Sequence, residues 1–549
     1  MSVDPPQSPR RVGEKADRLV FQPDASLALL RGINLIADAI RPTLGPIPRS
    51  IAFDLADAEK PPELLDKGGL IARRITDLPD RDEDMGAMLF RGMLWQLYDE
   101  LGDGTATAAL LFQTIVSDGL RVIVAGADAM RLRGELNRQL ELALNALRQQ
   151  MTAIEGRDKL AQLAHSICQD RELAERLGEI FDFIGEYGQL DVRRGHRREI
   201  AHDYMRGMYW NRGAVSRAML RGGKEPDRMV MNDSAIMLSD LDIESLDEVA
   251  TLFAALMQAG AKNLLLVGGK FSEPVINFIL ANKKPEQFRV VAVKTPGETP
   301  QHQHAHLMDM AVISGATPLY KAAGDTLRGM KTARLGSAKQ VWVERNLFGL
   351  VSDRDNQQEL TEHLADLLEQ LDYARGKDSE SVLRARVGKI LGGVAILRIG
   401  DGLPARMDAR IALAKETAKS LRQALRDGVV PGGGAALWAI RDALRDQPTG
   451  DFESRAARRI LLRALEMPLR TICSNAGYDG ATVARLDGEA PGTGIDARSG
   501  EAVDMLSAGI VDVASVVEAS LHKAVSSAAL ALTIDVLLHH ATPPSSYSP

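Results

Sequence analysis

The stretch Gly102-Asp103-Gly104-Thr105-Ala106-Thr107 stands directly ahead of an apolar helix that we predict over Thr105–Val124. Glycine lets the backbone approach a ligand closely, and a helix N-terminus presents free N–H groups to phosphate oxygens. An aspartate between two glycines, followed by two hydroxyls, could hold a magnesium ion that bridges phosphates. An ordinary helix cap would use the same residues, so this motif alone leaves both interpretations open.

Two more turns of this kind occur in the chain. Thr43-Leu44-Gly45-Pro46 follows a helix predicted over Asp24–Arg41, and Gly428-Val429-Val430-Pro431-Gly432-Gly433-Gly434 precedes one predicted over Ala435–Arg445. Each turn alone would be interpreted as a cap, but three of them in helical surroundings favour nucleotide binding. The familiar fingerprints are absent, because Phe271 replaces the hydroxyl that a P-loop needs after Gly268-Gly269-Lys270.

Composition excludes several classes of protein. The 549 residues carry 67 Lys and Arg against 74 Asp and Glu, a net charge of −7, which argues against binding nucleic acid or an anionic membrane. Aromatic residues make up only 4%, so base or sugar stacking is not the main activity. Two cysteines cannot build a disulfide framework, and the start of the chain lacks the apolar stretch of a secretory signal. We expect a cytoplasmic multidomain protein.

The two ends of the chain are alike and the centre differs. Apolar residues at helical spacing predict helices in the first third and after residue 409, whereas short aliphatic runs in the centre predict strands alternating with helices. A discontinuous helical domain with an inserted α/β domain explains this order. The predicted helices include Met85–Leu101, Ala129–Met151, Ser245–Ala259, Glu273–Ala281, Glu359–Val387, Ala409–Arg426, Phe452–Ala476 and Ala514–Leu538. The predicted strands are Arg228–Leu238, Asn263–Val267, Arg289–Val293, Gln340–Glu344 and Val394–Ile399.

Three histidines, His302, His304 and His306, alternate in sequence. An extended backbone would place them on one side, where they could bind a transition metal. We favour a solvated loop after Pro296-Gly297 without a metal. The Pro- and Ser-rich tail, Thr542–Pro549, is expected to be disordered.

The three turns, in this order, resemble the group I (GroEL-type) chaperonin large subunits of bacteria and organelles. The resemblance covers about 500 residues collinearly. It also includes Leu30–Ala39, Asp84–Ala87, Asn211–Gly213, Leu391–Ala395 and Ala508–Asp512. It implies a mixed α and β subunit of three domains. These are an equatorial ATP-binding domain (1–149 and 427–549), an intermediate hinge domain (150–205 and 395–426) and an apical domain that binds clients and lid (206–394).

The resemblance also implies a site for ATP and Mg²⁺, with Asp103 as the metal ligand. The implied phosphate and metal contacts are Thr43, Leu44, Gly45, Pro46, Asp103, Gly104, Thr105, Ala106 and Thr107. The implied ribose and base contacts are Gly433, Asp496, Ala497 and Asp512, and Gly432 is implied to line the nucleotide site beside them.

The chain departs from the family in its catalytic residues. Where the family usually reads Lys-Asp-Gly, this chain reads Asp66-Lys67-Gly68. If the chain is aligned to the family without a gap, Lys67 takes the position of the carboxylate that positions the attacking water. A one-residue shift in the loop would place Asp66 at that position instead. Glu416 stands for the family's hinge-helix aspartate, and its extra methylene moves the carboxylate by about an ångström, which can cost ~100-fold in rate. With Glu416 and Asp66 as catalytic residues, we expect ATP hydrolysis that is slow.

The apical domain also departs from the family. Leu246, Phe253, Ile276 and Leu280 lie on the predicted helices that correspond to the family's client groove, although such a stripe also suits a core. The resemblance implies a homo-oligomeric heptameric ring, usually paired back to back with a second, that binds non-native polypeptides and a small GroES-type co-chaperonin lid. The leading hypothesis is an ATP-dependent folding chamber. The alternative is a divergent paralogue with weak or no ATPase that acts as a binding scaffold.

Overall fold

The computed structural model describes residues 18–46, 49–54, 62–195, 199–205, 208–221, 228–282, 288–330, 332–352, 357–374, 377–391, 394–400, 404–446 and 450–539. The chain divides into two compact units. Unit 1 combines Met1–Gly178 with Glu416–Pro549, and unit 2 is Glu179–Lys415. Both ends of the chain therefore build one helical unit, which confirms the predicted discontinuous domain. The finer division into equatorial, intermediate and apical domains stays a prediction.

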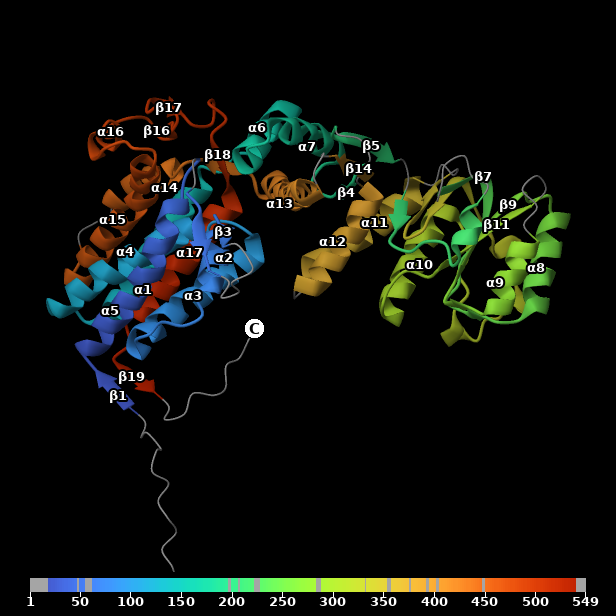
Figure 1. Ribbon diagram of the computed structural model, residues 1–549, viewed down its shortest axis with the longest axis horizontal. Coiled ribbons are helices and arrows are strands. Elements are labelled where there is room, and N and C mark those ends of the chain that lie inside the picture. Colours follow the sequence, from blue (N-terminus) through green and yellow to red (C-terminus); the bar gives the residue numbers. More distant parts are fainter. Residues whose placement is uncertain are drawn as a thin grey trace, which may run out of the picture. The chain divides into compact units, whose positions relative to one another are not determined.

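Unit 1 is a bundle of helices around one apolar core. Its helices are α1 (Asp24–Ile40), α2 (Gly68–Arg74), α3 (Arg81–Leu101), α4 (Thr105–Val124), α5 (Ala129–Arg148), α6 (Arg157–Cys168), α14 (Ala435–Arg445), α15 (Phe452–Asn475), α16 (Gly480–Ala484) and α17 (Ala514–Ala531). Two more, α7 (Arg171–Ile184) and α13 (Pro404–Asp427), cross the boundaries between the units. Helices from the two chain ends lie side by side, with α4 packed against both α15 and α17 (Figure 1).

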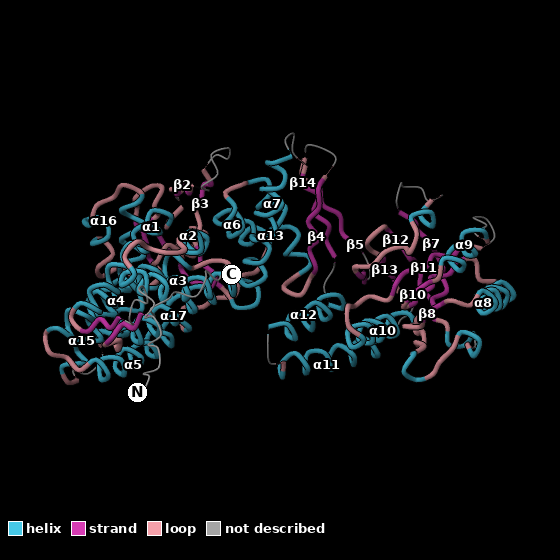
Figure 2. Tube along the Cα trace, turned by 60° about the horizontal axis from the view of Figure 1, so that its bottom comes forward, coloured by secondary structure: helices cyan, strands magenta, loops and turns pink. Residues whose placement is uncertain are grey.

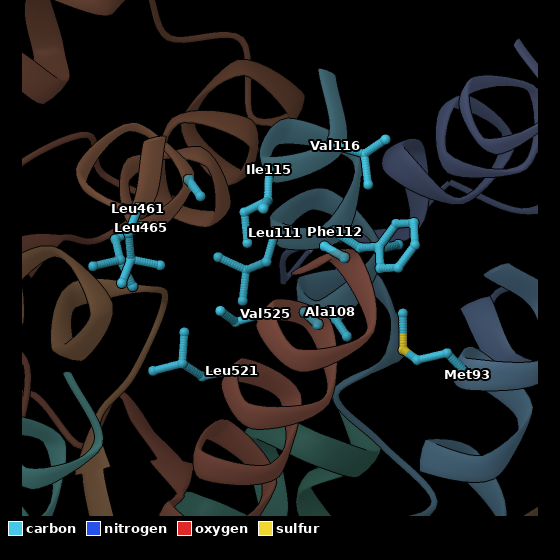
Figure 3. Packing of buried hydrophobic residues seen from close by; sticks show 14 of the residues in the cluster. Met93, Ala108, Leu111, Phe112, Ile115, Val116, Leu461, Leu465, Leu521 and Val525 are labelled. Carbon is cyan, nitrogen blue, oxygen red and sulfur yellow. The ribbon is translucent and has the colours of Figure 1, made fainter. Parts of the chain in front are cut away.

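The core of unit 1 joins residues that are far apart in sequence. Figure 3 shows Phe112 of α4 near Met93 of α3, and Leu111 in the space between Leu465 of α15 and Val525 of α17. All of these side chains are buried. By length and composition α4 is also apolar enough to cross a membrane, but half of its most apolar stretch is buried within the protein. Its apolar character is therefore explained by its place in the core.

Short antiparallel strand pairs complete unit 1. They are β1 (Arg18–Phe21) with β19 (Val536–His539), β2 (Ile51–Phe53) with β3 (Glu63–Leu65), β15 (Val429–Pro431) with β18 (Val511–Val513), and β16 (Thr493–Ile495) with β17 (Ala502–Asp504). The pair β15–β18 brings the third glycine turn against a segment near the end of the chain.

Among its described residues, unit 2 is an α/β structure with two sheets of three or more strands. The larger has the order β11 (Arg289–Lys294), β9 (Asn263–Gly268), β7 (Arg228–Met237), β12 (Gly336–Glu344), β13 (Phe348–Val351), β6 (Met208–Trp210). The β11–β9–β7 pairs are parallel and the others antiparallel. Parallel strands buried on both faces need apolar runs, as Leu264–Val267 provides. In the smaller sheet, β14 (Val394–Ile399) lies between β4 (Gln189–Arg194) and β5 (Ala201–Met205) (Figure 2).

The other strands and α-helices that lie wholly within unit 2, among the described residues, are a short parallel pair and five helices. The pair is β8 (Asp242–Ile243) with β10 (Lys270–Phe271). The helices are α8 (Leu246–Gln258), α9 (Glu273–Ala281), α10 (Pro300–Ser314), α11 (Gln357–Tyr373) and α12 (Lys377–Leu391).

Two predictions of local structure were wrong. The histidine stretch is not a loop, because Thr299 caps α10 by accepting from the His302 N–H and Pro300 starts the helix. The helix predicted over Ala514–Leu538 ends at Ala531, before β19. The predicted helical character of Glu359–Val387 is confirmed by α11 and α12. The predicted disordered tail lies outside the described residues.

Candidate nucleotide site

The turn between α3 and α4 is shaped by two glycines with positive φ. Gly102, at +81°, ends α3, and Gly104, at +82°, begins α4. A Cβ on Gly104 would lie 2.3 Å from Ser520 Oγ of α17, so only glycine fits this backbone. The Asp103 carboxylate accepts a 2.6 Å hydrogen bond from the Gly104 N–H and is exposed. The first N–H groups of α4 lack partners within the helix, as at any helix start, and the geometry suits an anion.

The loop ahead of α2 packs against this turn. The Gly69 N–H donates to Thr105 Oγ1 at 3.1 Å. A Cβ on Gly68 would lie 2.8 Å from Ile40 Cγ2 and 2.9 Å from Thr105 Oγ1. The end of α1, the start of α2 and the start of α4 therefore meet at one point, and the Thr105 hydroxyl hydrogen remains able to donate.

The Thr43–Pro46 turn is held from α15. Asn475, the last residue of that helix, donates through Nδ2 to the carbonyls of Arg41 at 3.0 Å and Leu44 at 2.8 Å. The Thr43 side chain is buried and donates to the Ile40 carbonyl at 2.8 Å. Asn475 escaped the sequence analysis because nothing local links it to a turn more than 400 residues earlier.

The glycine turn before α14 positions an aspartate from β18. In the β15–β18 pair, Val430 is the register partner of Asp512, and the Gly432 N–H donates to the Ile510 carbonyl at 2.9 Å. The Asp512 carboxylate accepts a hydrogen bond from the backbone of Gly433. Gly434, with φ of +82°, begins α14.

The hairpin β16–β17 carries the two other residues predicted for ribose and base. Asp496 accepts from the Arg498 N–H at 2.9 Å and from Ser499 Oγ at 3.1 Å, so its carboxylate is engaged within its own turn. Ala497 is buried. The hairpin lies against the start of α14, because a Cβ on Gly494 would be 2.9 Å from the Cβ of Ala435.

Asp103 and Asp512 form an electrostatic pair. Burial and, next, the charge of Asp103 raise the pKa of Asp512 to about 7. The pKa of Asp103 is also raised, chiefly because protein atoms displace water around it, although its side chain keeps some contact with solvent. A divalent cation between them would relieve this repulsion.

These oxygens fit Mg²⁺. That ion is usually held by one or two carboxylates, together with substrate phosphates and water, rather than by a complete protein cage. Among the described residues, no cluster of three or more His, Cys, Asp or Glu side chains could hold a metal by itself. The pair Asp103–Asp512 therefore suits a magnesium ion that arrives with nucleotide.

Glu416 of α13 reaches the same site. It forms an ion pair with Lys67, the residue that caps α2. Asp66 is exposed. The residue of this loop that pairs with Glu416 is Lys67. Tyr98 of α3 also lies near this site, and the sequence analysis missed it. Burial is the main cause that raises the pKa of Tyr98, and the charges of Lys67, Glu416, Asp66 and Asp103 act on it as well.

The four predicted client contacts differ in exposure. Leu246, at the start of α8, is 41% exposed, whereas Ile276 and Leu280 of α9 are partly buried against the core of unit 2. Phe253 is only 4% exposed and packs on Phe288 in that core. The role of Phe253 as a client contact stays a prediction.

A helical unit built from both chain ends and interrupted by an inserted α/β unit is the architecture of a chaperonin subunit of the GroEL type. The TCP-1/cpn60 chaperonin family matches residues 36–542, and the chain belongs to that family. It is thus a divergent member of a family of ATP-dependent molecular chaperones.

Solved structures have the same fold. The chaperonin gp146 from bacteriophage EL 2 (Pseudomonas aeruginosa), crystallised in the presence of ATP-BeFx, is 17% identical, with a TM-score of 0.67 over 95% of this chain and 99% of that one. A second crystal form of gp146 gives a TM-score of 0.61 over 95% and 98%, again with 17% identity.

Proposed function

We propose that this chaperonin binds Mg²⁺ and ATP in unit 1 and hydrolyses the ATP to drive a folding cycle. The convergence of Asp103 and Asp512 between the starts of α4 and α14 carries the proposal. Two carboxylates whose pKa values are raised together mark a site whose negative charge is not fully neutralised, although the charge of Lys67 acts on Asp103. The Mg²⁺ ion that accompanies ATP would supply positive charge to these carboxylates when it is bound.

The residues of the site have distinct proposed roles. The backbone N–H groups at the start of α4 bind phosphate oxygens, and Asp103 holds the metal. Asp512 and the β16–β17 hairpin border the ribose and base. Glu416 accepts the proton of the attacking water, because it is a carboxylate that contacts the loop beside α4. The role predicted for Asp66 stays a prediction.

The cellular role is the binding and ATP-driven release of non-native polypeptides. Leu246 of α8, with its exposed side chain, is a suitable client contact. Membership of the family favours a heptameric ring, single or paired with a second, and a small co-chaperonin lid. Cys168 and Cys473 are buried and are not joined in a disulfide, which is compatible with the cytoplasmic location that we propose.

Magnesium-dependent ATP hydrolysis by the purified chain tests this proposal, with Glu416→Ala as the variant. Turnover in the wild type that collapses in the variant, together with ATP-dependent refolding of a denatured client, is the expected result. Intact rings that neither bind nucleotide nor release client on ATP addition would instead favour a binding scaffold.

A further inference from the structure

The ion pair between Lys67 and Glu416 has properties of an exchangeable contact. The two residues are 349 positions apart, and their side chains are 34% and 46% exposed. Neither residue is locked in place by burial, and exposed ion pairs contribute little to stability. Each side chain is therefore free to take another partner.

The backbone that carries Lys67 is, in contrast, firmly held. The Lys67 carbonyl accepts the first hydrogen bond of α2 from Ile71 at 3.0 Å, and Gly69 is bonded to Thr105 of α4. Gly68 has no room for even a methyl group. The ammonium group can therefore move only by rotation of the four-carbon side chain, because the backbone of Lys67 is fixed beside the start of α4.

The charges around Lys67 are mostly negative. Its charge lowers the pKa of Asp103, whereas that of Glu416 raises it, and burial outweighs both. Asp512 in turn interacts with Asp103. The ammonium group of Lys67 therefore lies among several carboxylates at the place where the proposed function puts the phosphates of ATP. A second ammonium group, that of Lys419, donates to the Glu100 carbonyl just ahead of the same turn.

We propose that Lys67 senses the terminal phosphate of ATP and exchanges between that phosphate and Glu416. This inference rests on the proposed function, because it needs the phosphates at the start of α4. Without nucleotide, or with ADP, Lys67 neutralises Glu416. The terminal phosphate of ATP carries more negative charge than one carboxylate and draws the ammonium group to itself.

Departure of Lys67 makes Glu416 available for the chemical step. A water oxygen bonds to the γ-phosphorus, its proton passes to the Glu416 carboxylate, and the bond from the γ-phosphorus to the β–γ bridging oxygen breaks. The products are ADP and inorganic phosphate. The reversed order of Asp66 and Lys67 thus makes the availability of Glu416 as the base depend on bound ATP.

The affinities of ADP and a non-hydrolysable ATP analogue test this proposal without relying on turnover. Both are measured by calorimetry with Mg²⁺ on the full-length wild type and on Lys67→Gln, Lys67→Arg and Glu416→Gln. In Lys67→Gln we expect the affinity for the analogue to fall about tenfold and that for ADP to change less than about twofold. We expect Lys67→Arg to keep most of the preference for the analogue over ADP. We expect Glu416→Gln to bind the analogue more tightly than wild type, because Lys67 no longer has a competing carboxylate.

Lys523→Gln is the matched control. Lys523 forms another Lys–Glu ion pair in unit 1, with Glu100 at 2.8 Å, but does not contact Glu416. This variant is expected to keep the wild-type ratio of the two affinities. An equal effect of Lys67→Gln on ADP and analogue, or none on either, would overturn the exchange and leave a structural ion pair. Wild-type protein that binds neither nucleotide would instead defeat the proposed function itself, and the exchange with it.

Discussion

Asp103, between two glycines at the start of α4, acts electrostatically on Asp512 of β18, and together with burial it raises the pKa of Asp512 to about 7. A carboxyl group normally titrates near pH 4. Folding thus places two mutually repelling acids in one site, and this cost in stability is explained if the site is built for a cation.

Stability without nucleotide should depend on Asp512. Because its pKa is raised on folding, the folded chain binds more protons than the unfolded chain between about pH 4 and pH 7, so stability falls as the pH rises through that range. Asp512→Asn removes this loss. We expect the variant to melt at a higher temperature than wild type at about pH 8, with the difference shrinking towards pH 5. A difference independent of pH would contradict the assignment.

Asp103→Asn should weaken the effect of magnesium on nucleotide binding. The amide keeps the size of the carboxylate but lacks its charge, so we expect the gain in ADP affinity on adding Mg²⁺ to fall at least about tenfold. Titration of ADP with and without Mg²⁺ measures this gain. Asp446→Asn, an exposed aspartate after the far end of α14, serves as control and should behave as wild type.

Gly104→Ala and Gly126→Ala separate steric contact from backbone strain. Both glycines have positive φ, at +82° and +103°, but a Cβ at Gly126 would meet nothing within 4 Å. Strain costs roughly 1–2 kcal/mol in either variant, and the clash with Ser520 adds about 1–3 kcal/mol in Gly104→Ala. Hydrogen exchange of α4 and nucleotide titration should therefore report a larger loss in Gly104→Ala. Equal losses would show that the contact with α17 relaxes freely.

Asp309→Asn should loosen α10 from α11 and α12. The Asp309 carboxylate is buried in α10, where it accepts from Arg386 of α12 at 2.8 and 3.0 Å and lies 2.9 Å from His363 Nε2 of α11. Burial opposes its ionisation, but hydrogen bonds from these residues and His306 together hold the pKa of Asp309 well below its usual range.

The expected cost of Asp309→Asn is about 3–5 kcal/mol, because the buried Arg386 loses its charged partner. Faster hydrogen exchange in α11 and α12 is the measurement. Asp366→Asn, at an exposed site on α11, is the control. Since the pKa of Asp309 is lowered, its contribution is present above about pH 4 and is lost only in stronger acid. Unchanged exchange in Asp309→Asn would mean that α11 and α12 are held by apolar contacts instead.

Local signals in the sequence predicted many elements closely. Thr105–Val124, Glu273–Ala281, Val394–Ile399 and Ala435–Arg445 match the observed bounds, because glycine turns and regular apolar spacing act over a few residues. The prediction of a loop over His302–His306 was wrong, although the sequence carries a local signal for the start of a helix there. Thr299 and Pro300 are a typical helix start, and the alternation of histidines was given more weight.

The order of motifs also determined the architecture. Three glycine turns divided between the chain ends, with an α/β segment between them, predicted a discontinuous helical unit, and unit 1 has this composition.

Tertiary structure alone decided which side chains meet. It paired Lys67 with Glu416, set Asp512 near Asp103, attached Asn475 to the Thr43–Pro46 turn and buried Phe253 in the core of unit 2. The physical reason is the range of the interactions. Turns and helices follow from neighbouring residues, whereas the pairing of groups hundreds of positions apart depends on how whole helices pack around a shared core.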